Sequence, residues 1–168
     1  MKIGLGFDLH RLQKNRPLYL GGVRIDYPSG LLGHSDGDVI LHAVADALLG
    51  SLARPDIGCL FPDTDPSLKG IRSTEILKKV MAMLRQERYG VHNLDVIIIC
   101  EKPKLAPYYE EIRKSLAGLL KIPLSRVGLK AKTAEQLGFI GRGQAIACWA
   151  AVLVRPLLPQ KSSFTSRR

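Results

Sequence analysis

Three side chains that lie far apart in the sequence could together bind one metal ion. Asp8 and His10 are two residues apart near the end of a strand-like segment, so their side chains project from the same face. His42 lies in a helical segment, away from the apolar stripe that includes Ile40 and Val44, which disfavours a role as a core histidine. Two imidazoles and one carboxylate suit Zn²⁺ or a similar divalent ion, and three protein ligands leave one position open for substrate or water.

The alternative is that the Asp-x-His pattern arises by chance and that Asp8 only caps a turn. Two further carboxylates bear on the choice, because Asp38 and Asp46 each lie four residues from His42. We expect both to accept hydrogen bonds from the His42 ring and so orient it for metal binding.

Two more clusters combine polar side chains with backbone amides. His34, Ser35 and Asp36 precede the helical segment, and the amides at a helix N-terminus favour an anionic group. Ordinary capping explains Ser35 and Asp36 but leaves His34 unexplained. Residues 132–135 are followed by 138–143, where three glycines in six residues let backbone amides approach a ligand closely. A plain turn is the alternative for this second cluster.

The strands that must position these side chains are predicted from alternation. Residues 2–8 alternate apolar with small or polar side chains, as in a half-buried strand, and residues 127–133 repeat the pattern. Residues 18–25 predict a hairpin with a Gly-Gly turn. The continuous apolar run 96–100 predicts a strand covered on both faces, and 144–154 predicts the last strand.

Helical spacing predicts three helices, at residues 36–49, 73–87 and 107–120. We expect Ser35 or Asp36 to cap the first helix and Ser73 or Thr74 to cap the second. Residues 55–70 form a long loop of the kind that often binds ligands. The predicted fold is α+β, with helices packed on one face of a sheet.

Composition excludes several classes of protein. The chain has 168 residues, 46% hydrophobic and 24% charged, which indicates one folded domain rather than a disordered, collagen-like or disulfide-rich chain. We expect this domain over residues 1–155 and a flexible basic tail over 156–168. No run approaches the ~20 apolar residues that span a membrane, and no targeting segment is evident. With three isolated cysteines, these features favour the cytoplasm.

The formal net charge of +10 permits polyanionic partners. Four cations without any acid lie in residues 155–168, which leaves +6 for the rest of the chain. This charge could attract RNA, a membrane surface or a small diphosphate. An RNA-binding module is disfavoured because no aromatic and basic residues interleave along a surface strand. A zinc hydrolase is a further alternative, although no general base is arranged as in the HExxH motif.

Taken together, the motifs resemble those of the 2-C-methyl-D-erythritol 2,4-cyclodiphosphate synthase family of the non-mevalonate isoprenoid pathway. They run in the family's order over essentially the whole domain. The segments that carry the resemblance are Gly6-Phe7-Asp8-Leu9-His10, residues 34–39 and 42–47, residues 56–58 and 61–65, and residues 132–135 and 137–143.

The resemblance implies a lyase that cyclises 4-diphosphocytidyl-2-C-methyl-D-erythritol 2-phosphate and releases CMP. The substrate's own 2-phosphate attacks the β-phosphorus, so the protein must position the groups and neutralise charge. By family likeness, Asp8, His10 and His42 hold Zn²⁺, and Glu135 helps to bind a Mg²⁺ or Mn²⁺ ion on the diphosphate. The same likeness makes His34 and Thr133 stabilisers of the transition state.

The resemblance also implies a substrate-binding set shared between subunits of a homotrimer whose sheets face inward. Neither nucleic acid nor a membrane is implied as a partner. The methylerythritol part would lie against Ser35, Asp56, Ile57, Gly58, Phe61, Pro62, Asp63, Thr64 and Asp65. The cytidine would lie against Cys100, Glu101, Lys102, Pro103, Lys104, Leu105 and Ala106, with Lys132, Thr133, Ala134 and Glu135. Asp8, Leu9, His10, His34, Phe139 and Arg142 complete the set.

One position departs from the family pattern. Gln144 stands where relatives often carry an acid, and in relatives this position and Arg142 face the central channel of the trimer. Because Gln144 is neutral, the charge of Arg142 is less compensated than in those relatives. The resemblance therefore does not imply that a ligand binds in the channel.

Overall fold

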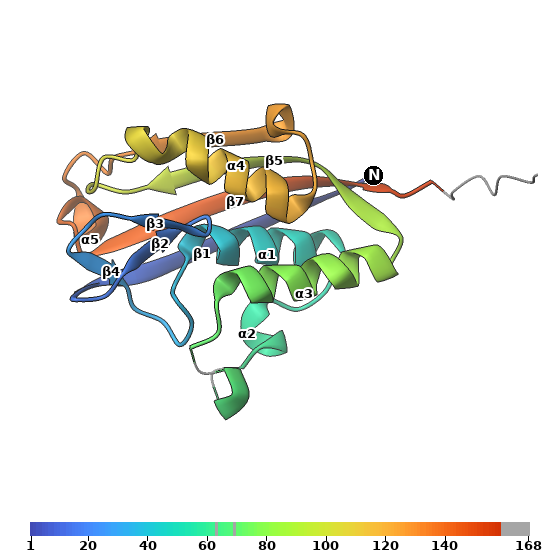
Figure 1. The fold of residues 1–168 in the computed structure, drawn as a ribbon, viewed down its shortest axis with the longest axis horizontal. Coiled ribbons are helices and arrows are strands. Elements are labelled where there is room, and N and C mark those ends of the chain that lie inside the picture. Colours follow the sequence, from blue (N-terminus) through green and yellow to red (C-terminus); the bar gives the residue numbers. More distant parts are fainter. Residues whose placement is uncertain (63, 69, 159–168) are drawn as a thin grey trace, which may run out of the picture.

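A five-stranded mixed sheet forms the body of the protein in a computed structural model that describes residues 1–62, 64–68 and 70–158 (Figure 1). The strand order is β4-β1-β7-β5-β6, in which only β5 and β6 pair in parallel. A separate pair, β2 and β3, forms the predicted hairpin. The strands are β1 (Lys2–Lys14), β2 (Leu18–Leu20), β3 (Val23–Ile25), β4 (Ser29–Leu31), β5 (Tyr89–Ile99), β6 (Val127–Lys132) and β7 (Ala145–Pro156).

The three longer helices cover one face of this sheet, which confirms the predicted α+β class (Figure 1). The second and third of them carry an apolar stripe toward the core, as the spacing predicted, whereas the first is buried almost all round. The helices are α1 (Val39–Ser51), α2 (Ile57–Leu60), α3 (Ser73–Gln86), α4 (Tyr109–Leu120) and α5 (Gly138–Gly141). Single 3₁₀ turns lie at Pro66–Leu68, Ala106–Tyr108 and Leu124–Arg126. Helix α2 and the first of these turns lie within the segment that was predicted to be a loop.

Strand β1 packs unusually close to helix α1 because two glycines face the helix. A β-carbon on Gly4 would overlap the carbonyl oxygen of Ala47, and one on Gly6 would overlap that of Ala43. No side chain larger than hydrogen fits at either position. This contact sets the separation between the elements that carry Asp8, His10 and His42.

The opposite face of β1 is apolar and exposed in the single chain. Ile3 and Leu5 are 75% and 70% exposed, and Phe7 packs against Trp149 of the neighbouring strand β7, with tilted rings whose centroids are 4.5 Å apart. Ile97 of β5 is also exposed on its sheet, so the prediction that residues 96–100 are covered on both faces is wrong for one chain. Strand β1 also runs six residues beyond its predicted end, because β7 and β4 both pair with its second half.

The helix caps differ from those predicted. The side chain of Asp38, rather than of Ser35 or Asp36, caps α1 by accepting from the amides of Ile40 and Leu41 at 3.2 Å. Arg72 occupies the N-cap position of α3 without any side-chain bond, so neither Ser73 nor Thr74 is the cap there. The side chains of Ser35, Asp36 and Ser73 therefore do not cap a helix and are available for other hydrogen bonds.

Residues 159–168, most of the predicted tail, lie outside the described part of the chain. Pro156 ends β7 and is followed by two further described residues. Among the helices of the described residues, none is both long and apolar enough to cross a bilayer.

Candidate metal centre and substrate pocket

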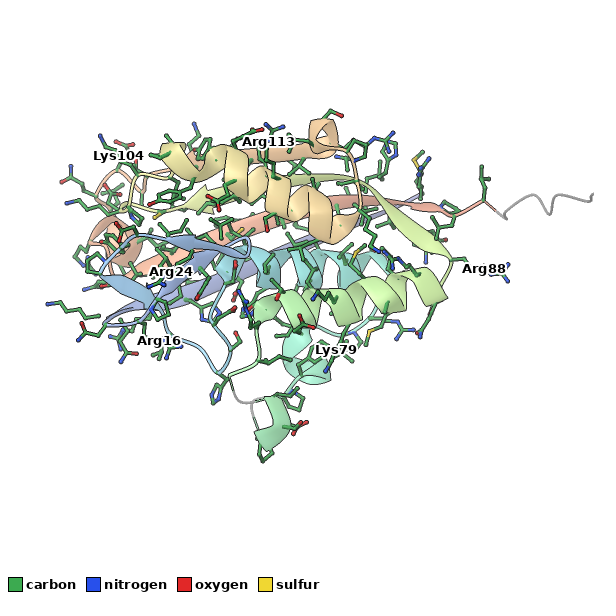
Figure 2. The ribbon with its side chains drawn as sticks, in the orientation of Figure 1. Arg16, Arg24, Lys79, Arg88, Lys104 and Arg113 are labelled. Atoms are coloured by element: carbon green, nitrogen blue, oxygen red, sulfur yellow. The ribbon has the colours of Figure 1, made fainter. Side chains whose placement is uncertain are left out.

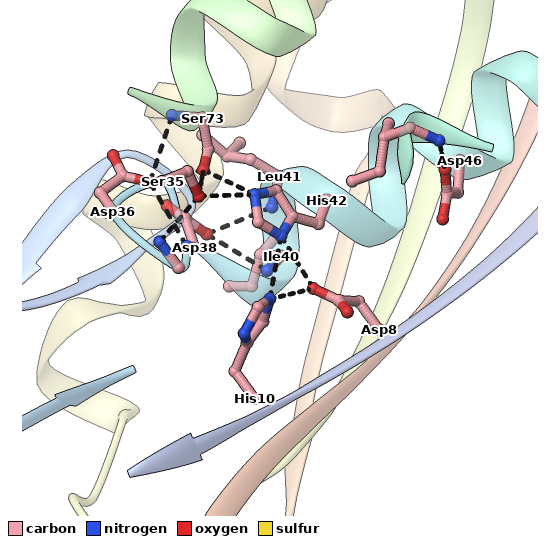
Figure 3. A network of polar contacts seen from close by, with 12 residues as sticks. Asp8, His10, Ser35, Asp36, Asp38, Ile40, Leu41, His42, Asp46 and Ser73 are labelled. Atoms are coloured by element: carbon pink, nitrogen blue, oxygen red, sulfur yellow. Dashed lines mark hydrogen bonds and ion pairs between the residues drawn. The ribbon is translucent and has the colours of Figure 1, made fainter. Parts of the chain in front are cut away.

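Strand β1 and helix α1 bring Asp8, His10 and His42 to one point (Figure 3). Asp8 Oδ2 lies 3.0 Å from His10 Nε2 and 3.0 Å from His42 Nδ1, and the two ring nitrogens are 3.1 Å apart. Tetrahedral Zn²⁺, with bonds of about 2.0–2.1 Å, keeps its ligand atoms about 3.3 Å apart. The nearly equilateral triangle therefore fits such an ion with little movement.

The outer ring nitrogen of each histidine is held by a hydrogen bond. His10 Nδ1 lies 2.6 Å from the carbonyl oxygen of Leu32, which can only accept, so this nitrogen carries the proton. His42 Nε2 lies 2.9 Å from Ser73 Oγ and 3.1 Å from Ser35 Oγ. In a neutral ring whose outer nitrogen is protonated, the inner nitrogen presents a lone pair toward Asp8, and three acceptors that meet at one point suit a bound cation.

The charges of the cluster reinforce one another. In the cluster without a cation, burial raises the pKa of Asp8, but hydrogen bonding with His10 and His42 and the charge of these rings outweigh it and bring the pKa of this carboxyl well below its usual range. Burial lowers the pKa of His10, but the hydrogen bond and charge of Asp8 outweigh it, so the net shift is upward. Asp8 is therefore ionised at neutral pH and available as a ligand.

Asp38 and Asp46 do not orient His42, contrary to the prediction. Asp38 is fully buried and accepts from the amides of Gly21 and Gly22 at 2.8 and 2.6 Å, besides capping α1. Asp46 accepts from the amide of Ile57 at 2.8 Å and so ties α2 to α1. Burial raises the pKa of Asp46, and the nearby charges of Asp56 and Asp8 raise it further.

A cavity of about 490 Å³ opens beside the metal cluster, a size typical of small-molecule sites. Nine residues of the predicted substrate-binding set line this cavity, together with the metal ligand candidate His42. The nine are Asp8, His10, His34, Ser35, Ile57, Gly58, Phe61, Pro62 and Asp65. The residues predicted to contact the methylerythritol part therefore lie beside the candidate metal ligands. Sequence reasoning did not single out the apolar lining residues Leu32, Leu68, Ile71 and Ile76, which carry no motif.

Three described residues of the predicted set near this cavity, Leu9, Asp56 and Thr64, fall outside its lining. Asp56 caps α2 through the Cys59 amide at 2.9 Å, and Thr64 is exposed in the following loop. The side chain of Leu9 lies on the opposite, apolar face of β1 because neighbouring residues of a strand alternate. Asp63 lies outside the described residues.

The predicted cytidine set forms a second cluster where β5 and β6 end. The Cys100 amide donates to the carbonyl oxygen of Lys132 at 2.9 Å, and the Ala134 amide donates to Glu101 Oε2 at 3.1 Å. The Thr133 hydroxyl donates to Glu135 Oε1 at 2.6 Å. Phe139 lies on α5, and Arg142 directly follows it.

The two clusters are separate within one chain. Strand β6 is three places from β1 in the sheet, a distance of roughly 14 Å at the usual strand spacing. Among the described residues, no member of the cytidine set lines the cavity beside the metal cluster. Glu135 and Thr133 therefore do not join His34 and the metal ligands inside a single chain.

Three cationic side chains of the described residues lie far apart from one another. In Figure 2, Arg88 lies at one end of the molecule, Lys104 near the other, and Lys79 on α3 between them. A nucleic-acid groove needs basic residues gathered along one face, and these three side chains do not share one.

Comparison with known proteins agrees with this arrangement. Residues 1–155 match the model of the YgbB family. The 2-C-methyl-D-erythritol 2,4-cyclodiphosphate synthase of Geobacillus kaustophilus is 56% identical over 154 residues, which cover 92% of this chain and 98% of that protein. The synthase of Geobacter metallireducens is 53% identical over 154 residues, which again cover 92% of this chain and 98% of that protein.

Solved structures of such synthases have the same fold. A synthase bound to CDP superposes with a TM-score of 0.85 at 40% identity, covering 92% of this chain and all of that one. IspF of Plasmodium falciparum, in a complex with CDP, superposes with a TM-score of 0.82 at 35% identity, covering 94% of this chain and 97% of that one.

Proposed function

The chain belongs to the YgbB family, and we propose that the cavity beside Asp8, His10 and His42 is its active site. The chain is a lyase of the non-mevalonate isoprenoid pathway, and it cyclises 4-diphosphocytidyl-2-C-methyl-D-erythritol 2-phosphate with release of CMP. The observation that carries the site assignment is the convergence of three ligand atoms within 3.1 Å at the wall of that cavity.

In this reaction an oxygen of the 2-phosphate forms a bond to the β-phosphorus, and the bond from that phosphorus to the CMP oxygen breaks. No covalent nucleophile of the protein is needed, so the chain must hold the two phosphates in line and offset their charge. We assign Asp8, His10 and His42 to Zn²⁺, which when bound supplies positive charge beside the diphosphate.

Two side chains are proposed to donate hydrogen bonds where charge shifts during the attack. His34 lines the cavity next to the metal ligands, and we propose that it donates to a phosphate oxygen. Thr133 lies in the second cluster, and we propose the same role for its hydroxyl. Glu135 accepts from that hydroxyl, and its carboxylate suits a hard Mg²⁺ or Mn²⁺ ion on the phosphates.

The separation of the two clusters supports an active site shared between subunits. We propose a homotrimer in which the exposed apolar sheet faces meet and the second cluster of one subunit completes the cavity of its neighbour. The cytidine then lies against Cys100–Ala106 and Lys132–Glu135, in keeping with the relatives that bind CDP. The methylerythritol part lies against Ser35, the residues 56–58 and 61–65, and the wall that β1 and α1 form.

We also propose that the protein works in the cytoplasm. Cys59, Cys100 and Cys148 are free thiols in the structure, as is usual for a reducing compartment.

His42→Ala tests the assignment of the active site. We expect the variant to lose zinc binding and CMP release together, since two ligands rarely hold Zn²⁺ tightly. Zinc content is measured by atomic absorption, and the product by ³¹P NMR, which distinguishes a cyclic diphosphate from a linear hydrolysis product. His92→Ala, which changes a histidine of β5 outside the cavity, is the matched control. Full turnover by His42→Ala in the presence of a chelator would refute the assignment.

A further inference from the structure

Ser73 contacts the metal cluster from a helix that carries none of its ligands. It is the first residue of α3, and it is 1% exposed. Its Oγ lies 2.9 Å from His42 Nε2 and 2.5 Å from Asp36 Oδ1, and its amide donates to the same oxygen at 3.2 Å (Figure 3). Because Ser73 does not cap its helix, its hydroxyl is available for these two contacts.

The directions of these hydrogen bonds follow from what each group can donate. The Asp36 carboxylate only accepts, so the Ser73 hydroxyl must donate its proton to Asp36. The lone pairs on Ser73 Oγ then accept from His42 Nε2–H. The remaining nitrogen of that ring, Nδ1, is left without a proton, and it is the atom that faces Asp8 and His10.

A second hydroxyl near the ring is less suited to this role. Ser35 Oγ lies 3.1 Å from His42 Nε2, a longer distance than that to Ser73 Oγ. It already accepts the amide proton of Gly37 at 3.0 Å, and its other contact, at 3.4 Å, is to the Ser73 hydroxyl rather than to a carboxylate. The Ser73 path is therefore the one that connects His42 to a negative charge.

We propose that Ser73 and Asp36 are positioning residues for the metal ligand His42, in a carboxylate, hydroxyl and imidazole relay. The relay fixes the ring tautomer that exposes Nδ1 and increases the electron density on that nitrogen, which strengthens its bond to the metal. It plays the part that sequence reasoning had assigned to Asp38 and Asp46. The inference rests on the proposed metal site.

The relay also fixes the loop that carries His34 and Ser35. Asp36 Oδ1 accepts both protons that Ser73 offers, so the loop before α1 is tied to the start of α3. A purely structural role would end there, and it would predict lower stability with unchanged metal affinity. The two roles are therefore separable by experiment.

The test compares Ser73→Ala with Ser51→Ala in the full-length protein. Ser51 is also a buried serine, 5% exposed, whose hydroxyl donates to the carbonyl oxygen of Leu48 at 2.7 Å on α1, away from the metal ligands. The dissociation constant of Zn²⁺ is measured by competition with a chromophoric chelator. We expect Ser73→Ala to raise it about 10- to 100-fold and Ser51→Ala to leave it unchanged.

Asp36→Asn provides a second variant that keeps an acceptor for the Ser73 hydroxyl but removes the charge. We expect it to weaken zinc binding by a smaller factor than Ser73→Ala. In both variants, the visible absorption bands of bound Co²⁺ should change, which a stability defect alone does not cause. This variant decides the matter if Ser73→Ala does not fold.

Zinc affinities equal to that of the parent in Ser73→Ala, or in Asp36→Asn where the serine variant is unfolded, would overturn the relay. That result leaves the proposed function intact, since the parent would still bind zinc and form the cyclic product. A parent protein that binds no zinc at Asp8, His10 and His42 would instead overturn both proposals.

Discussion

His10 and His42 present different ring nitrogens to the same carboxylate, and each choice is fixed by the group behind the ring. His10 reaches Asp8 with Nε2 because its Nδ1 is bound to the Leu32 carbonyl oxygen, whereas His42 uses Nδ1 because its Nε2 faces hydroxyls. The orientation of the proposed metal ligands therefore depends on residues that are not ligands themselves. This dependence explains why the ligand motif alone does not describe the site.

The three cysteines differ in exposure, so their thiol reactivity tests the burial that the structure gives each of them. Burial raises the pKa of Cys100 to about 12 and that of Cys148 well above its ordinary value. Cys59 is exposed, and its hydrogen bond to Asp56 and the charge of that carboxylate raise its pKa. At pH 8 we expect one thiol per native chain to react with Ellman's reagent, slowly, and three after unfolding in guanidinium.

The rate at Cys59 should rise with pH because the thiolate fraction rises, and Asp56→Asn should increase it at fixed pH by removing the negative charge. Cys59→Ser is the control, and it should abolish the native reaction. Rapid reaction of two or three native thiols would contradict the burial of Cys100 and Cys148.

At the site, the sequence was sufficient to name the three side chains that could hold a metal ion but not the residues that hydrogen-bond to them. Asp8 and His10 share a strand face, so their proximity follows from local geometry. His42 is buried on a helix that is covered almost all round, and the packing of that helix on β1 brings it to the other two. Asp38 was mistaken for a partner of His42 because its true partners, the amides of Gly21 and Gly22, come from a hairpin that no local pattern places nearby. Ser73 lies 31 residues from His42, and no sequence signal connects them.

At the scale of elements, the contact between β1 and α1 sets the spacing of the metal ligands. Gly6→Ala would place a methyl group on the carbonyl oxygen of Ala43, and no rotamer can relieve a clash with backbone. We expect the free energy of unfolding to fall by about 3 kcal/mol and zinc affinity to fall with it, because Asp8 and His10 move away from His42. Chemical denaturation and chelator competition measure the two effects.

Gly118→Ala is the matched control for this substitution. Gly118 lies in α4 with no atom within 4 Å of an added β-carbon, so alanine should stabilise the helix by about 0.5–1 kcal/mol. Zinc affinity should not change. A Gly6→Ala protein with the stability and zinc affinity of the parent would show that β1 and α1 are not held as closely as the structure describes.

At the scale of the whole molecule, the sequence of β1 predicts a strand with two different faces, but it does not determine which face is buried. The pattern of residues 2–8 distinguishes two faces of a strand, and burial rules favour the apolar face as the inner one. In the chain the glycine face is inner, because α1 approaches to backbone contact, and the face of Ile3, Leu5 and Phe7 is outer. Which of the two faces of β1 is buried depends on the helix, or the second chain, that packs against each of them.

An apolar sheet face exposed over several strands is unusual for a monomer, and it is the surface that the proposed trimer would bury. Besides the side chains of β1, it includes Ile97 and Trp149, each 38% exposed. If three chains bury this face together, light scattering should give a mass about three times 18.5 kDa. Leu5→Glu, which puts a charge on the face at a side chain 70% exposed in one chain, should shift the mass toward that of the monomer.

Because the two clusters lie about three strands apart in one chain, the Leu5→Glu monomer should lose cyclising activity. It should still bind zinc, since all three ligands belong to a single subunit. Leu158→Glu, at a side chain 88% exposed beyond the end of β7, should keep both the trimer mass and the activity. A monomeric Leu5→Glu protein with full activity would mean that one chain closes its own site, which the distance between β1 and β6 argues against.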